Sequence, residues 1–115
     1  MLNREAILAA QDLKTEDVDV PEWGGAVRVR MMSGLERDAL GASLVGPDGK
    51  VSAERYKYKV LVRSLAADDG SRLFRDDEIE ALAAKNPSVL ERLYQVADRL
   101  NGMSESAVGA AEKNS

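Results

Sequence analysis

The feature that most constrains the fold is the valine-rich stretch TEDVDVPEWGGAVRVRM at residues 15–31. Apolar and charged residues alternate on both sides of Trp23, which is typical of two antiparallel strands with one buried face. The two glycines after Trp23 supply the positive φ angles that a tight turn requires. We therefore expect a β-hairpin over residues 15–31.

The charge pattern of this hairpin predicts its register. Aligning Val20 with Val27 places valine opposite valine on one face and acid opposite arginine on the other. The pairs that follow are Val18 with Val29, Asp19 with Arg28, and Asp17 with Arg30. An isolated hairpin is marginal in water, so its valine face must be covered, most simply by helices.

Helical periodicity and end signals predict the elements that cover it. A helix over residues 3–12 begins at Asn3 and is too short to stand alone, so it must dock or fray. A helix over residues 33–45 opens with a capping box, in which Ser33 and Glu36 satisfy each other's backbone amides. We expect its apolar side to consist of Leu35, Ala39, Ala42 and Val45, with Leu40 and Leu44 beside them.

Three further helices are expected in the second half of the chain. The first spans residues 52–67 with Ser52 as its cap; its YKYKVLV segment also alternates like a strand, but length and composition favour a helix. The second spans about residues 76–85. The third runs from Asn86-Pro87 to Asn101-Gly102, which are typical start and stop signals.

These elements define the expected fold class. We expect an α+β fold that is mostly α, with an N-terminal β-hairpin packed against about four to five short helices. The length of 115 residues suits one domain, which we place at residues 1–102 with the hairpin at 15–31. Residues 103–115 are small and polar and are expected to form a flexible C-terminal tail.

The chain contains no cysteine and no histidine. Thiolate metal sites, cysteine nucleophiles and the commonest general base are therefore excluded, and we expect no enzyme activity and no cofactor. No stretch approaches the roughly 20 apolar residues of a membrane span, and the N-terminus lacks the form of a signal peptide. The cytoplasm is the expected location.

Two clusters of charged residues could suggest a ligand, one basic and one acidic. The net charge of −4 argues against nucleic acid, and the basic residues near position 60 spread around their helix instead of forming one face: Arg55, Lys57, Lys59 and Arg63. The acidic residues between 68 and 78 lack the spacing of a calcium loop, so a turn and a negatively charged helix start explain them better than a metal site or paired catalytic carboxylates: Asp68, Asp69, Asp76, Asp77 and Glu78.

The aromatic residues each allow two interpretations. Trp23, the only tryptophan, either folds back over the valine face or anchors a partner, and the high average burial of tryptophan favours the first. Tyr56 and Tyr58 point about 200° apart on a helix, so at most one belongs to the core. Tyr56 is expected to be partly buried, and Tyr58 is either partly buried or an exposed anchor.

The chain as a whole resembles a known family. The runs REAILAAQDLKTEDVDVPEWGGAVRVRMMSGLERDAL, LVRSLAADDGSRLFRDDEIEAL and LERLYQVADRLNGMSE, which together cover roughly residues 2–106, are similar to small tail assembly chaperones of long-tailed, siphovirus-type bacteriophages or prophages. The shared features are a Val-Pro-x-Trp-Gly-Gly hairpin turn, a Ser-Gly-x-Glu-Arg helix start, an Asp-Gly-x-Arg-Leu-Phe turn and a Leu-Asn-Gly helix end. Their order and spacing carry the resemblance.

The resemblance implies a non-enzymatic, transient assembly factor. Such a protein binds and solubilises the tape measure protein while the tail tube assembles, and it is absent from the mature virion. A frameshifted longer product of the family can recruit tail tube protein, and a homo-oligomer is a further expectation. Neither nucleic acid nor membrane is an expected partner.

We expect the partner to be held by apolar residues that the core does not need. These candidates are Trp23, Leu40, Leu44, Val45, Tyr58 and Val62. Two alternatives remain open at this point: a structural virion component, such as a tail completion or connector protein, and a small regulatory DNA binder. Detection in purified particles would favour the first, and salt-sensitive DNA binding would favour the second.

Overall fold

The structure is a computed structural model that describes residues 1–103. Its elements follow in the order α1 (Arg4–Ala9), β1 (Thr15–Val20), the 3₁₀ turn η1 (Pro21–Trp23), β2 (Gly25–Arg30), α2 (Gly34–Ser43), α3 (Tyr56–Ser64), β3 (Leu65–Ala66), α4 (Ile79–Ala83) and α5 (Pro87–Asn101). The expected α+β class, with an N-terminal hairpin and short helices, is confirmed. The tail expected at residues 103–115 lies, apart from Met103, outside the described residues.

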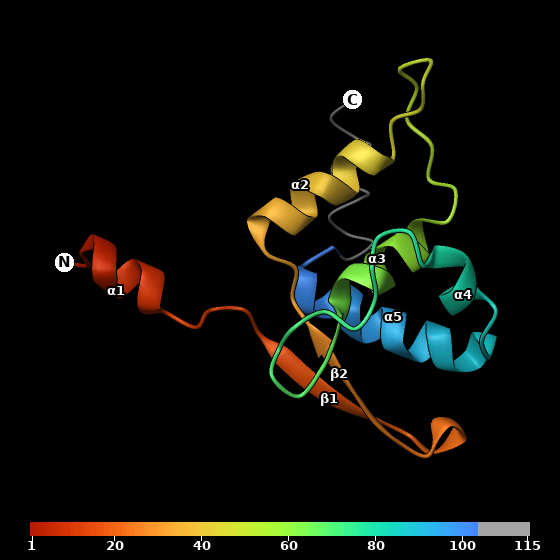
Figure 1. Cartoon of the computed structure of the whole chain (residues 1–115), viewed down its shortest axis with the longest axis horizontal. Helices are drawn as coiled ribbons and strands as arrows, with labels where there is room; N and C mark the ends of the chain where they lie inside the picture. Colours follow the sequence, from red (N-terminus) through yellow and green to blue (C-terminus); the bar gives the residue numbers. More distant parts are fainter. Residues whose placement is uncertain (104–115) are drawn as a thin grey trace.

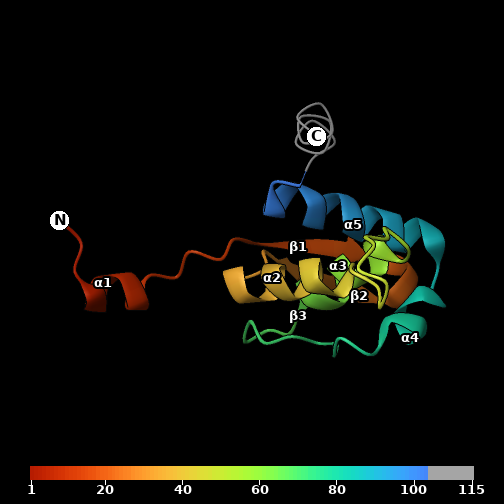
Figure 2. The same ribbon diagram turned by 90° about the horizontal axis from the view of Figure 1, so that it is seen from above.

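The sheet has three antiparallel strands in the order β1-β2-β3. The third strand was not predicted; it consists of the two residues that follow α3 directly and pairs with Arg28 and Val29 of β2. Helix α5 packs on β1 and β2, and α3 packs on α5 and α4 (Figures 1 and 2). Among the described residues, no helix is long and apolar enough to cross a membrane.

The hairpin register differs from the expected one by two residues. Val18 pairs with Val27, and Val20 pairs with Gly25 instead of Val27. The cause is the turn: the 3₁₀ turn Pro21–Trp23 and Gly24, at φ +80°, reverse the chain so tightly that Gly25 already belongs to β2. A shift of two residues preserves the side-chain alternation, so the valines still share one face.

Helix α3 lies at the centre of the molecule. Its residues from Val60 to Ser64 are all buried, because α5, α4 and α2 pack against it. The burial is limited to the C-terminal half of the helix, since residues 56–59 remain partly exposed. The core contains Val20, Val29, Met32, Leu40, Val60, Leu61, Val62, Leu65, Leu82, Val89, Leu90, Leu93 and Ala97.

Most predicted helix starts are confirmed. Asn3 accepts a 2.9 Å hydrogen bond from the Ala6 amide, Asn86 accepts one from the Ser88 amide, and the complete capping box is present at Ser33. The predicted cap at Ser52 is wrong. Helix α3 begins only at Tyr56, while the Ser52 hydroxyl accepts a hydrogen bond from the Glu54 amide in the preceding turn.

The predicted apolar side of α2 is also wrong. Leu35 is 81% exposed and Ala39 and Ala42 are exposed, whereas Leu40 is buried. The rotation of α2 follows from Glu36, which forms the capping box and a 2.7 Å ion pair with Arg30 of the hairpin. Because Glu36 faces the body, Leu40 one turn later faces it as well.

Helix α1 lies apart from the rest of the fold. Figures 1 and 2 show it at the end of an extended N-terminal segment, and none of its residues is buried. The sequence predicted that this helix must dock or fray. In the structure it is formed but is not docked on the body of the chain.

Candidate partner-binding surface

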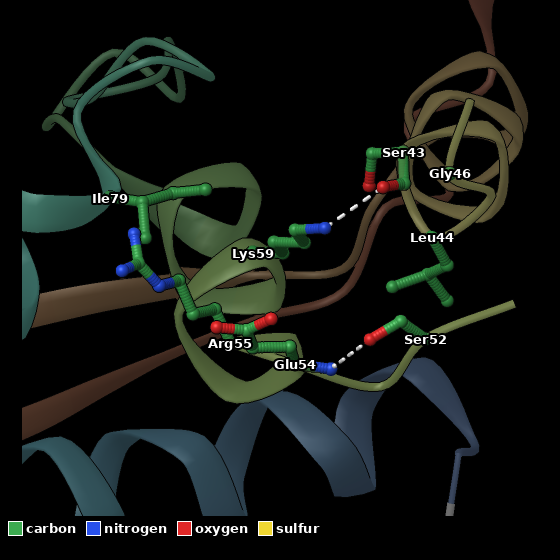
Figure 3. A pocket seen from close by; sticks show the side chains of 8 residues that line it. All are labelled: Ser43, Leu44, Gly46, Ser52, Glu54, Arg55, Lys59 and Ile79. Carbon is green, nitrogen blue, oxygen red and sulfur yellow. Dashed lines mark hydrogen bonds between the residues drawn. The ribbon is translucent and has the colours of Figure 1, made fainter. Parts of the chain in front are cut away.

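An open cavity of about 380 Å³ lies where the end of α2 meets the start of α3. Figure 3 shows the side chains around it, which come from α2, the 44–55 loop, α3 and α4. Its lining residues are Ser43, Leu44, Gly46, Ser52, Glu54, Arg55, Lys59 and Ile79. This surface therefore joins segments that are well separated in the sequence.

The 44–55 loop, which supplies five of the lining residues, also exposes two valines that do not line the cavity. Val45 and Val51 form an antiparallel bridge, and the Gly46 amide donates a 2.8 Å hydrogen bond to the Lys50 carbonyl. Gly49, at φ +76°, permits the tight reversal between them. Val45 is 48% exposed and Val51 is 74% exposed, so the loop presents two valines to solvent.

Two cations lie on the wall of the cavity. The Lys59 ammonium donates a 2.8 Å hydrogen bond to the Ser43 carbonyl at the C-terminal end of α2, where the helix dipole favours positive charge (Figure 3). Arg55 forms an ion pair with Glu80 of α4. The lining thus combines the apolar Leu44 and Ile79 with charged groups of both signs, since Glu54 lines the cavity as well.

Arg55 adopts an unusual backbone conformation. Its φ of 60° and ψ of 19° are left-handed, and it is the only non-glycine residue with positive φ in the described part of the chain. This conformation costs a side-chain-bearing residue about 1–2 kcal/mol. It turns the chain sharply from the loop into α3, which brings Ser52 and Glu54 to the same cavity as Lys59.

Comparison with known proteins decides the family. The sequence model of the family described as phage tail assembly chaperone matches residues 2–114. The chain belongs to the phage tail assembly chaperone family. The resemblance expected from the sequence is therefore confirmed.

A solved structure has a similar fold. The tail assembly chaperone of bacteriophage HK97 is 24% identical and superposes with a TM-score of 0.58, over 84% of this chain and 90% of that chain. No curated protein matches the chain.

The six expected contact residues of this tail assembly chaperone do not lie on one surface. Leu44 lines the cavity and is half-buried, and Val45 is exposed beside it in the loop. Tyr58 is half-buried and packs against the core. Trp23 is also half-buried against the core, but at the hairpin turn, which Figure 1 shows on the opposite side of the body from the 44–55 loop.

Two of the six residues are not spare to the core, contrary to the expectation. Leu40 is 3% exposed and Val62 is 0% exposed. Leu40 is on the inner side of α2 because Glu36 sets the rotation of that helix. Val62 is enclosed because α5, α4 and α2 pack around the C-terminal half of α3, so a position opposite to its apolar stripe is buried as well.

Sequence reasoning missed Ile79, Arg55 and Lys59 as lining of the cavity, and it missed the bridge between Val45 and Val51. A signal for the bridge existed: the two valines lie on either side of the turn Gly46-Pro47-Asp48-Gly49. Apolar residues on both sides of a glycine-containing turn favour a short antiparallel pairing. No local signal could place Ile79 there, because its position depends on how α4 packs against α3.

The acidic residues between 68 and 78 are engaged within the chain. The Asp76 carboxylate lies 2.6 Å from Arg72 and 3.3 Å from the buried Arg63, and the hydrogen bond from Arg72 lowers the pKa of Asp76 below its ordinary value. Asp77 pairs with Arg75 at 3.1 Å. Residues 1–103 contain no group of three or more His, Cys, Asp or Glu side chains that could hold a metal ion.

Proposed function

We propose that the chain is a non-enzymatic phage tail assembly chaperone that binds and solubilises the tape measure protein and assists tail tube assembly. The observation that carries this proposal is the open cavity between α2, α3 and α4, in which Leu44 and Ile79 lie among polar side chains, together with the exposed Val45 and Val51 of the adjoining loop, in a member of this family. A cavity with these properties suits the apolar side of a helical partner.

Burial of apolar surface supplies the binding energy in this proposal. A leucine or valine side chain that becomes fully buried contributes about 1.5–3 kcal/mol, so Leu44 and the two exposed loop valines alone give a weak contact. Copies that also associate with one another would hold an elongated partner more firmly, because each further contact of such a linked assembly is intramolecular. Weak single contacts also allow release when the tail tube replaces the chaperone.

The contact residues we propose are Leu44 and Val45 from the sequence, with Val51, which is bridged to Val45, and Ile79 from the cavity lining. Tyr58 and Trp23 remain predictions, since each retains a partly exposed ring. We place the protein in the host bacterial cytoplasm and outside the mature virion. A frameshifted longer product that contacts the tail tube protein, and a homo-oligomer, also belong to the proposal.

Co-expression tests the proposed function. The tape measure protein encoded by the same phage is expressed alone, with the wild-type chain, and with the double variant Val45→Asp and Val51→Asp. The wild-type chain is expected to move most of the tape measure protein into the soluble fraction, and the double variant to lose most of that effect. Leu73→Asp is the matched control, because Leu73 is 51% exposed but belongs to the segment that pairs with β3.

Two outcomes would contradict the proposal. Equal solubility of the tape measure protein with and without the wild-type chain would remove the chaperone role. Stoichiometric amounts of the chain in purified virions, measured by mass spectrometry, would instead support a structural virion component.

A further inference from the structure

Strand β1 forms one edge of the sheet, and its outer side has no neighbouring strand within residues 1–103. The ladder with β2 continues at the root of the strand, where the Met31 amide donates a 2.8 Å hydrogen bond to the Lys14 carbonyl. In an antiparallel ladder every second residue bonds to its neighbour, and the residues between them point away from it. The backbone amides and carbonyls of Thr15, Asp17 and Asp19 therefore point outward.

These outward backbone groups are accessible to a partner. Thr15, Asp17 and Asp19 are all exposed. Within residues 1–103 a single hydrogen bond reaches their backbone, a 3.5 Å contact from the Arg92 guanidinium to the Asp19 carbonyl. A row of unpaired amides and carbonyls at a sheet edge is a template on which a further strand can pair. The side chains of β1 then decide which strand pairs there.

The acidic side chains of β1 disfavour pairing with a second copy of the chain. When two outer edges pair antiparallel, outward residues lie opposite outward residues. Every register that overlaps three or more residues of Thr15–Val20 then places two acids opposite each other. The opposed pairs are Glu16 with Glu16, Asp17 with Asp17, Asp17 with Asp19, or Asp19 with Asp19. Like charges directly opposite destabilise a sheet, so the charge of the edge argues against a dimer formed by β1.

The inner neighbour of β1 shows which strand its side chains accept. Strand β2 alternates valine with arginine over residues 27–30. Arg28 lies opposite Asp17, with its Nε 2.8 Å from the Asp17 carboxylate, and Val27 lies opposite Val18. Val18 and Val27 both pack against the core. A strand that alternates basic and apolar residues is therefore complementary to β1 in charge and in the apolar side that it presents.

Asp19 carries the charge that such an incoming strand would meet. It lies opposite Ala26, so β2 gives it no cation, and within residues 1–103 its carboxylate forms no ion pair. The other acids of the strand are already paired, Glu16 with Arg99 at 2.9 Å and Asp17 with an arginine of β2. A lysine or arginine opposite Asp19 would complete a cross-strand pair of opposite charges that the chain itself lacks.

We infer that the outer edge of β1 is a docking site for an extended protein segment in which basic and apolar residues alternate. The segment pairs with β1 and bonds to the outward backbone groups of Thr15, Asp17 and Asp19. A basic residue opposite Asp19 fixes its register, and its charge distinguishes it from the acidic edge of a second copy. This surface shares no lining residue with the cavity between α2, α3 and α4, so the inference goes beyond the proposed function.

Short peptides added to the intact chain test the inference. The probe is a fluorescein-labelled seven-residue peptide that alternates lysine and valine, and its binding is followed by fluorescence anisotropy. Two further probes carry the same side chains but are N-methylated, one at the lysine amides and the other at the valine amides. With lysines opposite Asp17 and Asp19, the lysine amides face β1 and the valine amides face away, so the two probes differ only in which edge is blocked.

The expected result is at least tenfold weaker binding of the lysine-methylated peptide and little change for the valine-methylated one. A peptide with glutamate in place of lysine should not bind. Asp19→Lys should weaken binding of the unmethylated peptide at least threefold, whereas Asp38→Lys, at an exposed acid of α2, is the matched control and should leave it unchanged. Hydrogen exchange should slow at the amides of Thr15, Asp17 and Asp19 when the peptide binds.

Three results would overturn the inference. The first is that the lysine–valine peptide does not bind the wild-type chain. The second is equal binding of the two methylated peptides, which would mean general attraction of charge without strand pairing. The third is loss of binding in Val45→Asp with Val51→Asp but not in Asp19→Lys, which would place the peptide at the 44–55 loop. The proposed function fails separately, because its test measures the solubility of the tape measure protein and uses neither the peptides nor Asp19→Lys.

Discussion

The side-chain oxygen of Asn101 accepts a 2.7 Å hydrogen bond from the backbone amide of Met32, and both residues are buried. The same side chain donates a 2.8 Å hydrogen bond to the Ala97 carbonyl. One carboxamide thus connects the last turn of α5 to the segment that leaves β2. The candidate cavity depends on this connection indirectly, because α5 supports α3.

We expect Asn101→Ala to lower the free energy of unfolding by about 1–3 kcal/mol, because it leaves the buried Met32 amide without a partner. Urea denaturation measures this change. Gln95→Ala on the exposed side of α5 is the control and should change stability by less than about 0.5 kcal/mol. Equal effects of the two changes would contradict the structural role of Asn101.

Burial separates two leucines of α2 that the sequence ranked in the opposite order. Leu40→Ala should cost about 2–5 kcal/mol because it opens a cavity in the core, whereas Leu35→Ala should cost less than about 0.5 kcal/mol. Thermal unfolding of the two variants measures the difference. A larger loss for Leu35→Ala would show that α2 has the rotation expected from the sequence.

Acid should weaken the contact between the hairpin turn and α5. The hydrogen bond from Arg92 lowers the pKa of Glu22 from 4.5 to about 2. The contribution of the Glu22–Arg92 pair to the free energy of unfolding is therefore complete above about pH 4.5 and is lost as the pH falls toward 2. Urea denaturation between pH 2 and 7 should show a shallower decline for Glu22→Gln than for wild type.

Salt provides the check on this prediction. The carboxylate of Glu22 lies 2.6 Å from the guanidinium of Arg92, and both groups are partly exposed. We therefore expect 1 M NaCl to reduce the difference in unfolding free energy between wild type and Glu22→Gln. A difference that is independent of both pH and salt would mean that the ion pair is not its source.

The left-handed conformation of Arg55 predicts an unusual order of variants. Arg55→Gly should be more stable than Arg55→Val by about 1–2 kcal/mol, because glycine accepts φ 60° freely and a β-branched residue does not. Both variants lose the exposed ion pair with Glu80, so that loss cancels in the comparison. Chemical denaturation that shows the valine variant to be the more stable would contradict the conformation at the start of α3.

The predicted site shows how far local patterns reach. The sequence predicted Leu44 and Val45 as contact residues because they are apolar residues that the core does not need; the structure places Leu44 in the lining of the cavity and leaves Val45 exposed in the loop, and their contact with a partner stays a prediction. The sequence wrongly predicted that Val62 is spare to the core. A residue opposite an apolar stripe is exposed only when nothing packs on that side of the helix, and Val62 is buried because other helices pack there. Ile79 joined the site through the packing of α4.

The sequence by itself determined the hairpin faces and the helix caps at Asn3, Ser33 and Asn86, because alternation and capping depend on residues within a few positions of one another. Only the tertiary structure decided the hairpin register, the rotation of α2, the burial of α3 and the free position of α1. Those features depend on the geometry of the hairpin turn, on the ion pair between Glu36 and Arg30, and on which elements pack side by side. The local sequence patterns at these places allow more than one arrangement, so the pattern alone does not choose between them.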